Sequence, residues 1–194
     1  QYMTLGYLVA LGGNLLFRQK SPPETMQSAV DSLRAALGPV RACSQTYRTP
    51  AFPLGSGPDF ANAAALVESD LTPEAVLGTL HEIETAHGRR RTGRWGPRTL
   101  DLDLIAADDL IRPDAVEWGR WRALPPDRQL VEQPTNLILP HPRLQDRAFV
   151  LVPLMEVAPA WRHPLLNLTV REMHDNLTEE DRRSVVPWED PGCQ

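Results

Sequence analysis

The sequence predicts an α+β fold, a ferredoxin-like antiparallel sheet with helices packed on it, built from a βαββαβ core and C-terminal helices. Short apolar runs alternate with two amphipathic helical patterns in that order. A long loop rich in proline and glycine joins the two central strands, which is typical of antiparallel strands. With 194 residues, 42% of them apolar and 23% charged, the chain has the composition of one compact domain, assigned here to residues 1–194.

The first predicted elements lie in residues 5–47. Residues 5–11 form an apolar run, followed by Gly-Gly-Asn at 12–14, which predicts a buried strand ending in a tight turn. After two prolines, apolar residues recur at spacings of three and four from Met26 to Leu37, so we expect an amphipathic helix that ends before Gly38. Residues 40–47 are compatible with a second strand.

The next elements follow a predicted loop at residues 48–59, which holds three prolines and two glycines. Residues 60–67 are predicted to form the third strand. Thr72-Pro73-Glu74 supplies an N-cap, a proline at the first helical position and an acid in the first turn, so we expect a helix from there to Gly88.

The C-terminal part begins with residues 112–136, where periodicity is lost. This segment contains Trp118 and Trp121 and is too long for an ordinary connection, so we expect a surface insertion there. Residues 147–155 are strongly apolar, and residues 168–177 are predicted to form a final helix.

Composition excludes several classes of protein. The longest apolar run is far below the roughly 20 residues that span a bilayer, and no signal peptide pattern opens the chain, so we expect no membrane contact and a cytoplasmic location. The only cysteines, Cys43 and Cys193, are not in a CxxC pair, so neither a disulfide framework nor a thiolate metal site is predicted. The net charge of -5 argues against binding nucleic acid through bulk electrostatics.

Residues 99–105 alternate strictly between apolar and other residues. A strand there directs its leucines to one face and both Asp101 and Asp103 to the other, with the carboxylates about 7 Å apart at Cβ. Such a pair can hold two divalent cations, although a pair standing alone is more often a solvated surface. A loop that contains five arginines within residues 89–98 leads directly into this strand. Together these features predict a site for a polyphosphate, and glycines 88, 93 and 96 predict that the loop is a mobile lid.

The chain resembles the 6-hydroxymethyl-7,8-dihydropterin pyrophosphokinase family of folate biosynthesis. The most specific matching segment is RWGPRTLDLDLI at residues 94–105. The other segments occur in family order and, with it, span about three quarters of the chain: ALGGN at 10–14, YRTP at 47–50, PDFANA at 58–63, GR at 88–89, LPHP at 139–142 and RAFVLVPL at 147–154.

The resemblance implies a transfer of the intact β,γ-pyrophosphoryl group of ATP to the hydroxymethyl oxygen of the pterin, with release of AMP. It assigns two Mg²⁺ to Asp101 and Asp103, with ATP as co-substrate, and it places Arg89 and Arg98 on the transferring phosphates. The nucleotide residues that it implies are His81, Arg91, Arg94, Trp95, Leu104, His141 and Arg147. The pterin residues that it implies are Thr49, Pro50, Leu54, Phe60, Asn62 and Phe149.

The pterin assignment agrees with the chemistry of a flat heterocycle, which favours two aromatic faces and an amide beside them. Taken singly, each of these residues is more often an ordinary core or loop residue. His81 departs from the family, where a glutamine is frequent. The insertion at 112–136 comes just before Pro140-His141, and the sequence leaves open whether it adds a flap, alters the adenine contacts or forms an oligomer interface. Two alternatives are a nucleotidyltransferase, whose glycine-serine signature the chain lacks, and a nucleic-acid contact at the arginine loop, for which regular aromatic residues are missing. We expect ATP and the pterin as partners, no nucleic acid, and a monomer.

Overall fold

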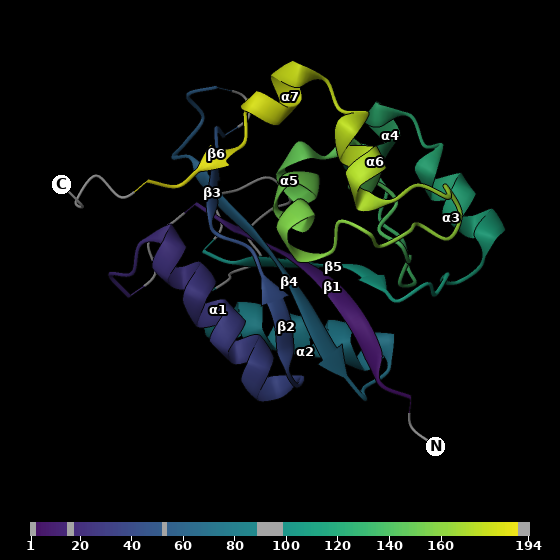
Figure 1. Cartoon of the computed structure of the whole chain (residues 1–194), viewed down its shortest axis with the longest axis horizontal. Coiled ribbons are helices and arrows are strands. Elements are labelled where there is room, and N and C mark those ends of the chain that lie inside the picture. Colours follow the sequence, from purple (N-terminus) through teal and green to yellow (C-terminus); the bar gives the residue numbers. More distant parts are fainter. Residues whose placement is uncertain (1–2, 15–17, 52–53, 89–98, 190–194) are drawn as a thin grey trace.

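The computed structural model describes residues 3–14, 18–51, 54–88 and 99–189. Its centre is an antiparallel sheet with the strand order β5-β1-β4-β3-β6, in which β2 also pairs with β4. The predicted α+β class and antiparallel sheet are confirmed (Figure 1). The strands are β1 (Leu5–Gly13), β2 (Val40–Cys43), β3 (Tyr47–Thr49), β4 (Phe60–Ser69), β5 (Asp101–Ala107) and β6 (Val186–Pro187).

Strand β1 is longer than the sequence predicted. It continues through Gly12 and Gly13, so the tight turn predicted at residues 12–14 is wrong. Gly12 pairs with Asn62 of β4 on one side and with Asp101 of β5 on the other. A glycine is flexible enough for a turn, but here partners on both sides hold the backbone extended.

The predicted strand at residues 40–47 is two short strands, β2 and β3, along one edge of β4. Between them the Ser44 hydroxyl accepts the N–H of Ala64, so a side chain replaces the missing main-chain partner. Arg48 and Thr49, which the sequence assigned to a loop, belong to β3. The start of that loop was therefore predicted too early.

Helices α1 (Pro22–Ala36) and α2 (Pro73–Ala86) cover one face of the sheet. Helix α1 begins with a capping box between Ser21 and Glu24, and α2 begins at the predicted N-cap, where the Thr72 hydroxyl accepts the N–H of Ala75. The apolar residues of both helices form one core with alternate residues of β1, β4 and β5. Both predicted helices are confirmed.

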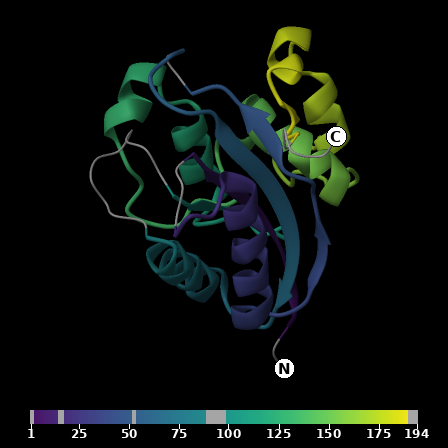
Figure 2. The same ribbon diagram turned by 90° about the vertical axis from the view of Figure 1, so that its left-hand side faces the viewer.

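Helices α5 (Ala148–Val157) and α6 (Val170–Asp175) lie over the other face (Figure 2). They form a second core with residues of the sheet that include Leu8, Ala64 and Ile105. A 3-10 turn at Leu144–Asp146 precedes α5, and helix α7 (Glu179–Arg183) leads into β6. The predicted final helix at residues 168–177 corresponds to α6, while α7 and β6 were not predicted.

The segment at residues 112–136 contains two helices that the sequence analysis missed, α3 (Ala115–Arg122) and α4 (Pro126–Val131). Asp114 caps α3, because its carboxylate accepts the N–H of Glu117. The two tryptophans of α3 are buried and form a small core with Leu124 and Ile138. Helices this short carry too few turns to show a clear apolar period.

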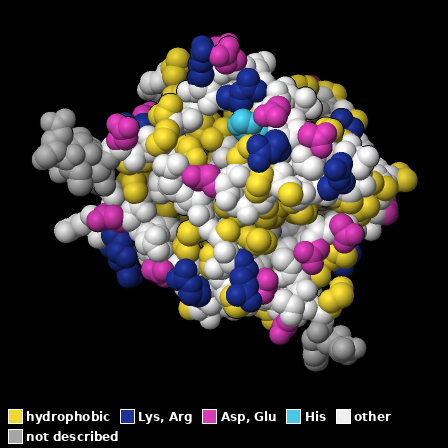
Figure 3. All heavy atoms as spheres, viewed as in Figure 1, with side chains coloured by type: hydrophobic (Ala, Val, Ile, Leu, Met, Phe, Trp, Pro, Cys, Tyr) yellow, Lys and Arg dark blue, Asp and Glu magenta, His cyan; other side chains and the backbone are white. Residues whose placement is uncertain are grey.

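The surface on the side seen in Figure 3 carries basic and acidic side chains that are interspersed, with no continuous field of either sign. In the described part of the chain, no helix is long and apolar enough to cross a membrane.

Candidate active site

Asp101 and Asp103 lie on β5, the edge strand of the sheet, and share one face of it. The alternate residues Leu100, Leu102 and Leu104 are at most 4% exposed and belong to the core under α1 and α2. The two aspartates are partly exposed and lie on the face of α5. This is the arrangement that the alternation of residues 99–105 predicted.

A row of cross-strand neighbours links Asp101 to the middle of the sheet. Asp101 is opposite Gly12 of β1, Gly12 is opposite Asn62 of β4, and Asn62 is opposite Tyr47 of β3. Neighbouring strands are about 4.8 Å apart, so Asn62 and Asp101 are separated by about 10 Å with no side chain between them. The sheet therefore offers a flat floor between an amide and a carboxylate.

The Asn62 amide is held in a defined orientation. Its Nδ2 donates to the Thr49 hydroxyl at 2.7 Å. Its Oδ1 is the nearest heavy atom to the position that a Cβ would take at Gly12, at 3.5 Å. The carbonyl oxygen of the amide is thus directed over the floor, where it can accept a hydrogen bond.

The aromatic residues predicted for the pterin come to the same part of the sheet. Phe60 lies two residues before Asn62 on β4, on the same face, and its strand partner is Thr49. Phe149, at the start of α5, is 40% exposed. It follows Ala148, which is buried against Tyr47, the strand partner of Asn62. Pro50 and Leu54 are exposed, beyond the end of β3.

A β-bulge in β5 connects the aspartates to His141. Val9 pairs with Leu104 and Leu8 with Ala106, which leaves Ile105 as the extra residue. The carbonyl of Ile105 accepts the N–H of His141 at 2.8 Å. His141 therefore lies beside the strand that carries Asp103.

The His141 ring is held in one tautomer. Its Nδ1 accepts the N–H of Arg143 at 3.2 Å, so the proton is on Nε2. Removal of the ring from water lowers the pKa of His141 to about 3, and the charges of Arg147 and Arg143 act in the same direction. The ring is therefore a neutral hydrogen-bond donor near neutral pH. The Arg147 guanidinium lies 5.5 Å from the centroid of the Phe149 ring.

Helix α2 supplies one contact that the predicted list lacks. Glu84 is 2% exposed, and its carboxylate accepts the N–H of Leu102 at 3.0 Å, between the two aspartates of β5. A buried acid in an amphipathic helix is the signal that points to this residue. Gly12, which the sequence analysis assigned to a turn, lies inside β1, where a glycine marks the close approach of another group.

Two residues predicted to bind the nucleotide lie on the side of the sheet that α1 and α2 cover. Leu104 is buried in the core under α2, so only its main chain is available at the edge of β5. His81 is exposed on α2, the helix that packs against that same core. The remaining predicted residues, Arg89, Arg91, Arg94, Trp95 and Arg98, lie outside the described residues.

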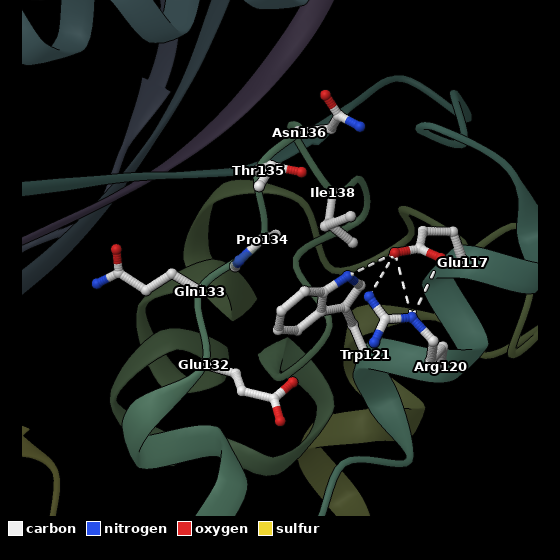
Figure 4. Close-up of a pocket in the computed structure, with 9 residues that line it drawn as sticks. All are labelled: Glu117, Arg120, Trp121, Glu132, Gln133, Pro134, Thr135, Asn136 and Ile138. Carbon is white, nitrogen blue, oxygen red and sulfur yellow. Dashed lines mark hydrogen bonds and ion pairs between the residues drawn. The ribbon is translucent and has the colours of Figure 1, made fainter.

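A separate pocket of about 300 Å³ lies in the 112–136 segment and its continuation (Figure 4). The Trp121 ring faces it, with Glu117 and Arg120 on one side and Glu132 on another. Of the predicted site residues that the structure describes, none lines it. This pocket is therefore distinct from the face that carries the aspartates.

The comparisons with known proteins identify the family. A family model described as 7,8-dihydro-6-hydroxymethylpterin-pyrophosphokinase (HPPK) matches residues 8–159. The chain belongs to this family. The predicted activity of this pyrophosphokinase is thereby confirmed: it transfers the pyrophosphoryl group of ATP to 6-hydroxymethyl-7,8-dihydropterin in folate biosynthesis.

Curated relatives cover most of the pyrophosphokinase. The 2-amino-4-hydroxy-6-hydroxymethyldihydropteridine pyrophosphokinase of Synechocystis sp. is 38% identical over 174 residues, which are 89% of this chain and 76% of the relative. The enzyme of the same name from Methylorubrum extorquens is 36% identical over 158 residues, 81% of this chain and 84% of the relative.

Solved structures show the same fold. The crystal structure of wild-type Plasmodium falciparum HPPK-DHPS matches with a TM-score of 0.65 at 14% identity, over 90% of this chain. The pyrophosphokinase spans 45% of that longer chain. The likeness therefore concerns the fold of one part of the Plasmodium protein.

Proposed function

We propose that the face of the sheet shared by Asp101, Asp103 and Asn62 is the site of pyrophosphoryl transfer, with the phosphates of ATP over β5 and the pterin over β4. One observation carries the proposal: Asn62, Gly12 and Asp101 are consecutive cross-strand neighbours. An amide suited to a heterocycle and a carboxylate suited to a phosphate-bound cation flank a residue without a side chain. A pterin lying on that floor would have its hydroxymethyl group beside the carboxylates.

The carboxylates of Asp101 and Asp103 fit Mg²⁺, which prefers a few carboxylate oxygens together with phosphate oxygens of the substrate. Bound there, two Mg²⁺ would neutralise the charge of the ATP phosphates and favour loss of the hydroxyl proton. We assign both ions to this pair. The Glu84 contact holds the backbone between the two aspartates, and the bulge at Ile105 follows them, so the two carboxylates have a rigid support.

The pterin ring would lie between Phe60 and Phe149, since both come to the end of the sheet where Asn62 lies. The Asn62 carbonyl oxygen would accept a hydrogen bond from the amino edge of the ring, because the bond from Nδ2 to Thr49 orients the amide and the oxygen is near Gly12. Thr49, Pro50 and Leu54 would border the ring from the end of β3. Stacking of this kind contributes on the order of 1 kcal/mol of binding free energy beyond the contribution of the buried area.

In the reaction, the hydroxymethyl oxygen forms a bond to the β-phosphorus of ATP. The bond from that phosphorus to the oxygen bridging to the α-phosphorus breaks, and AMP leaves with the electron pair. Arg89 and Arg98 would stabilise the charge on the transferring group, and Arg91, Arg94 and Trp95 would close over the nucleotide. His141, with its proton on Nε2, would donate to a nucleotide oxygen near Arg147, and His81 would approach from α2. The monomeric state and the cytoplasmic location stay predictions.

The nucleotide product tests the reaction. The protein, given ATP, Mg²⁺ and 6-hydroxymethyl-7,8-dihydropterin, should release AMP and form the pterin diphosphate in equal amounts, as measured by chromatography and mass spectrometry. Release of ADP, or of pyrophosphate, would contradict the assignment.

A matched pair of variants tests the residues. Asp101→Asn should reduce turnover by about a hundredfold or more, because a carboxylate that holds the cation is lost. Asp109→Asn removes the same charge from the exposed turn after β5 and should retain normal turnover. Equal rates in the two variants would remove Asp101 from the site.

A further inference from the structure

Three consecutive residues, Leu139, Pro140 and His141, are each held through a main-chain group by a hydrogen bond to another residue far away in the sequence. The N–H and carbonyl of Leu139 pair with the carbonyl and N–H of Arg112, at 3.1 and 2.9 Å. The carbonyl of Pro140 accepts from the Trp118 indole N–H at 2.7 Å. The N–H of His141 donates to Ile105 of β5. Two of the three supports therefore come from the 112–136 segment.

The contact from Trp118 is buried. Trp118 is 3% exposed, and its ring also meets that of His163 edge to face, with the centroids 5.0 Å apart. Proline has no N–H, so the carbonyl is the only main-chain group by which position 140 can be held. Without the indole N–H, that carbonyl would be left buried without this donor. Removing the donor alone is therefore a sharp perturbation of the segment.

We propose that helix α3 supports the nucleotide side of the active site, with Trp118 as a positioning residue that fixes Pro140 and thereby His141. The proposal rests on the assignment of His141 to the nucleotide in the proposed function. It gives the 112–136 segment a role in the reaction, although none of its residues is assigned to a substrate. The support acts through the main chain, since His141 follows the residue whose carbonyl Trp118 holds.

The expected consequence is a loss of ATP affinity without a matching loss of pterin affinity. If the segment spends only part of its time in the competent position, the apparent dissociation constant for ATP rises by the inverse of that fraction. Loss of one buried hydrogen bond corresponds to a factor of about three to ten. The predicted pterin residues lie on β3, β4 and α5 and in the loop after β3, and the Trp118 indole N–H bonds to none of them.

Trp118→Phe is the test variant, because it keeps an aromatic ring beside His163 and removes the N–H. Trp121→Phe is its matched control. It makes the same change three residues later in α3, but the Trp121 N–H donates to Glu117 of the same helix and holds no part of the 139–141 segment (Figure 4). Any effect on ATP that comes from loosening α3 in general should appear in both variants.

The measurement is the dissociation constant for an ATP analogue with a methylene group between the α- and β-phosphates, by titration calorimetry, together with the pterin KM. Trp118→Phe should raise the dissociation constant for the analogue about three- to tenfold, and Trp121→Phe should raise it less than twofold. The pterin KM should be unchanged in both variants. The exchange rate of the His141 amide hydrogen, measured by NMR in the absence of substrates, should rise in Trp118→Phe alone. This second measurement does not depend on activity.

Two results would overturn the inference while the proposed function stands. One is normal analogue affinity and normal His141 exchange in Trp118→Phe, while His141→Ala weakens the analogue. The other is that both tryptophan variants weaken the binding of the ATP analogue and of the pterin by equal factors. If His141→Ala also binds the analogue normally, the nucleotide role of His141 fails first, and the role of Trp118 fails with it.

Discussion

The two faces of the sheet use the same strands for different purposes. Under α1 and α2, alternate residues of β1, β4 and β5 are apolar along their whole length and form one core. On the other face, apolar residues such as Leu8 and Ala64 are confined to the part under α5 and α6. Toward the end of the sheet that face carries Asn62, Gly12 and Asp101. Stability and chemistry thus lie on opposite sides of the same backbone, and a single strand residue should affect mainly one of them.

The largest difference is expected between substitutions of Leu102 and Asp103, which are neighbours on β5. Leu102→Ala removes a side chain that is 3% exposed, and it should lower the free energy of unfolding by about 2–5 kcal/mol while the folded fraction keeps its turnover. Asp103→Asn, one residue later on the other face, should leave stability nearly unchanged and reduce turnover by about a hundredfold or more. Denaturant unfolding and AMP release measure the two quantities. The assignment of stability and chemistry to opposite faces would be wrong if the two substitutions changed the free energy of unfolding and the turnover to the same extent.

The second expected effect is a loss of folding stability at low pH, caused by a histidine on the α5 side of the sheet. His163, between α5 and α6, is fully buried beside Trp118 and Trp161, and its Nδ1 accepts the N–H groups of Leu165 and Leu166. Burial lowers the pKa of His163 to about 4, and the charge of Arg122 adds to this.

The unfolded chain takes up this proton near pH 6.5 and the folded chain only near pH 4. Stability is therefore full above about pH 6.5 and falls as the pH decreases to 4, by on the order of 3 kcal/mol from this residue. His163→Asn keeps an acceptor for the two N–H groups and does not titrate, so its unfolding free energy should fall less over that range. Parallel curves for the two proteins, measured by urea unfolding at several pH values, would exclude this role for His163.

The smallest expected effect is on the pterin KM, and it distinguishes Gly12 from Gly78. Gly12→Val adds a branched side chain to the floor between Asn62 and Asp101, where an added Cβ would lie 3.5 Å from the Asn62 Oδ1. It should raise the pterin KM roughly tenfold, because the added groups occupy the space of the ring. Gly78→Ala on α2, where a Cβ meets nothing within 4 Å, should leave the KM unchanged and stabilise the fold by about 0.5–1 kcal/mol. A normal pterin KM in Gly12→Val would place the pterin elsewhere.

Much of the fold could be predicted because its signals are local. The helix that starts at Thr72 is fixed by a cap, a proline and an apolar stripe within a few residues, and the structure begins it there. The alternation in residues 99–105 assigns Leu102 and Asp103 to opposite faces of any strand, whatever its neighbours are. The errors came where neighbours decide: Gly12 is held extended only by partners on both sides.

The sequence by itself determined the family, through the block at residues 94–105, and the face on which both aspartates lie. Only the tertiary structure decided what stands opposite them. The row from Asn62 through Gly12 to Asp101 depends on the register of three strands, and the contact of Trp118 with Pro140 joins residues 22 positions apart. Such contacts depend on how whole elements pack, since registers and helix positions are set by burial summed over many side chains, and no short stretch of sequence contains that sum.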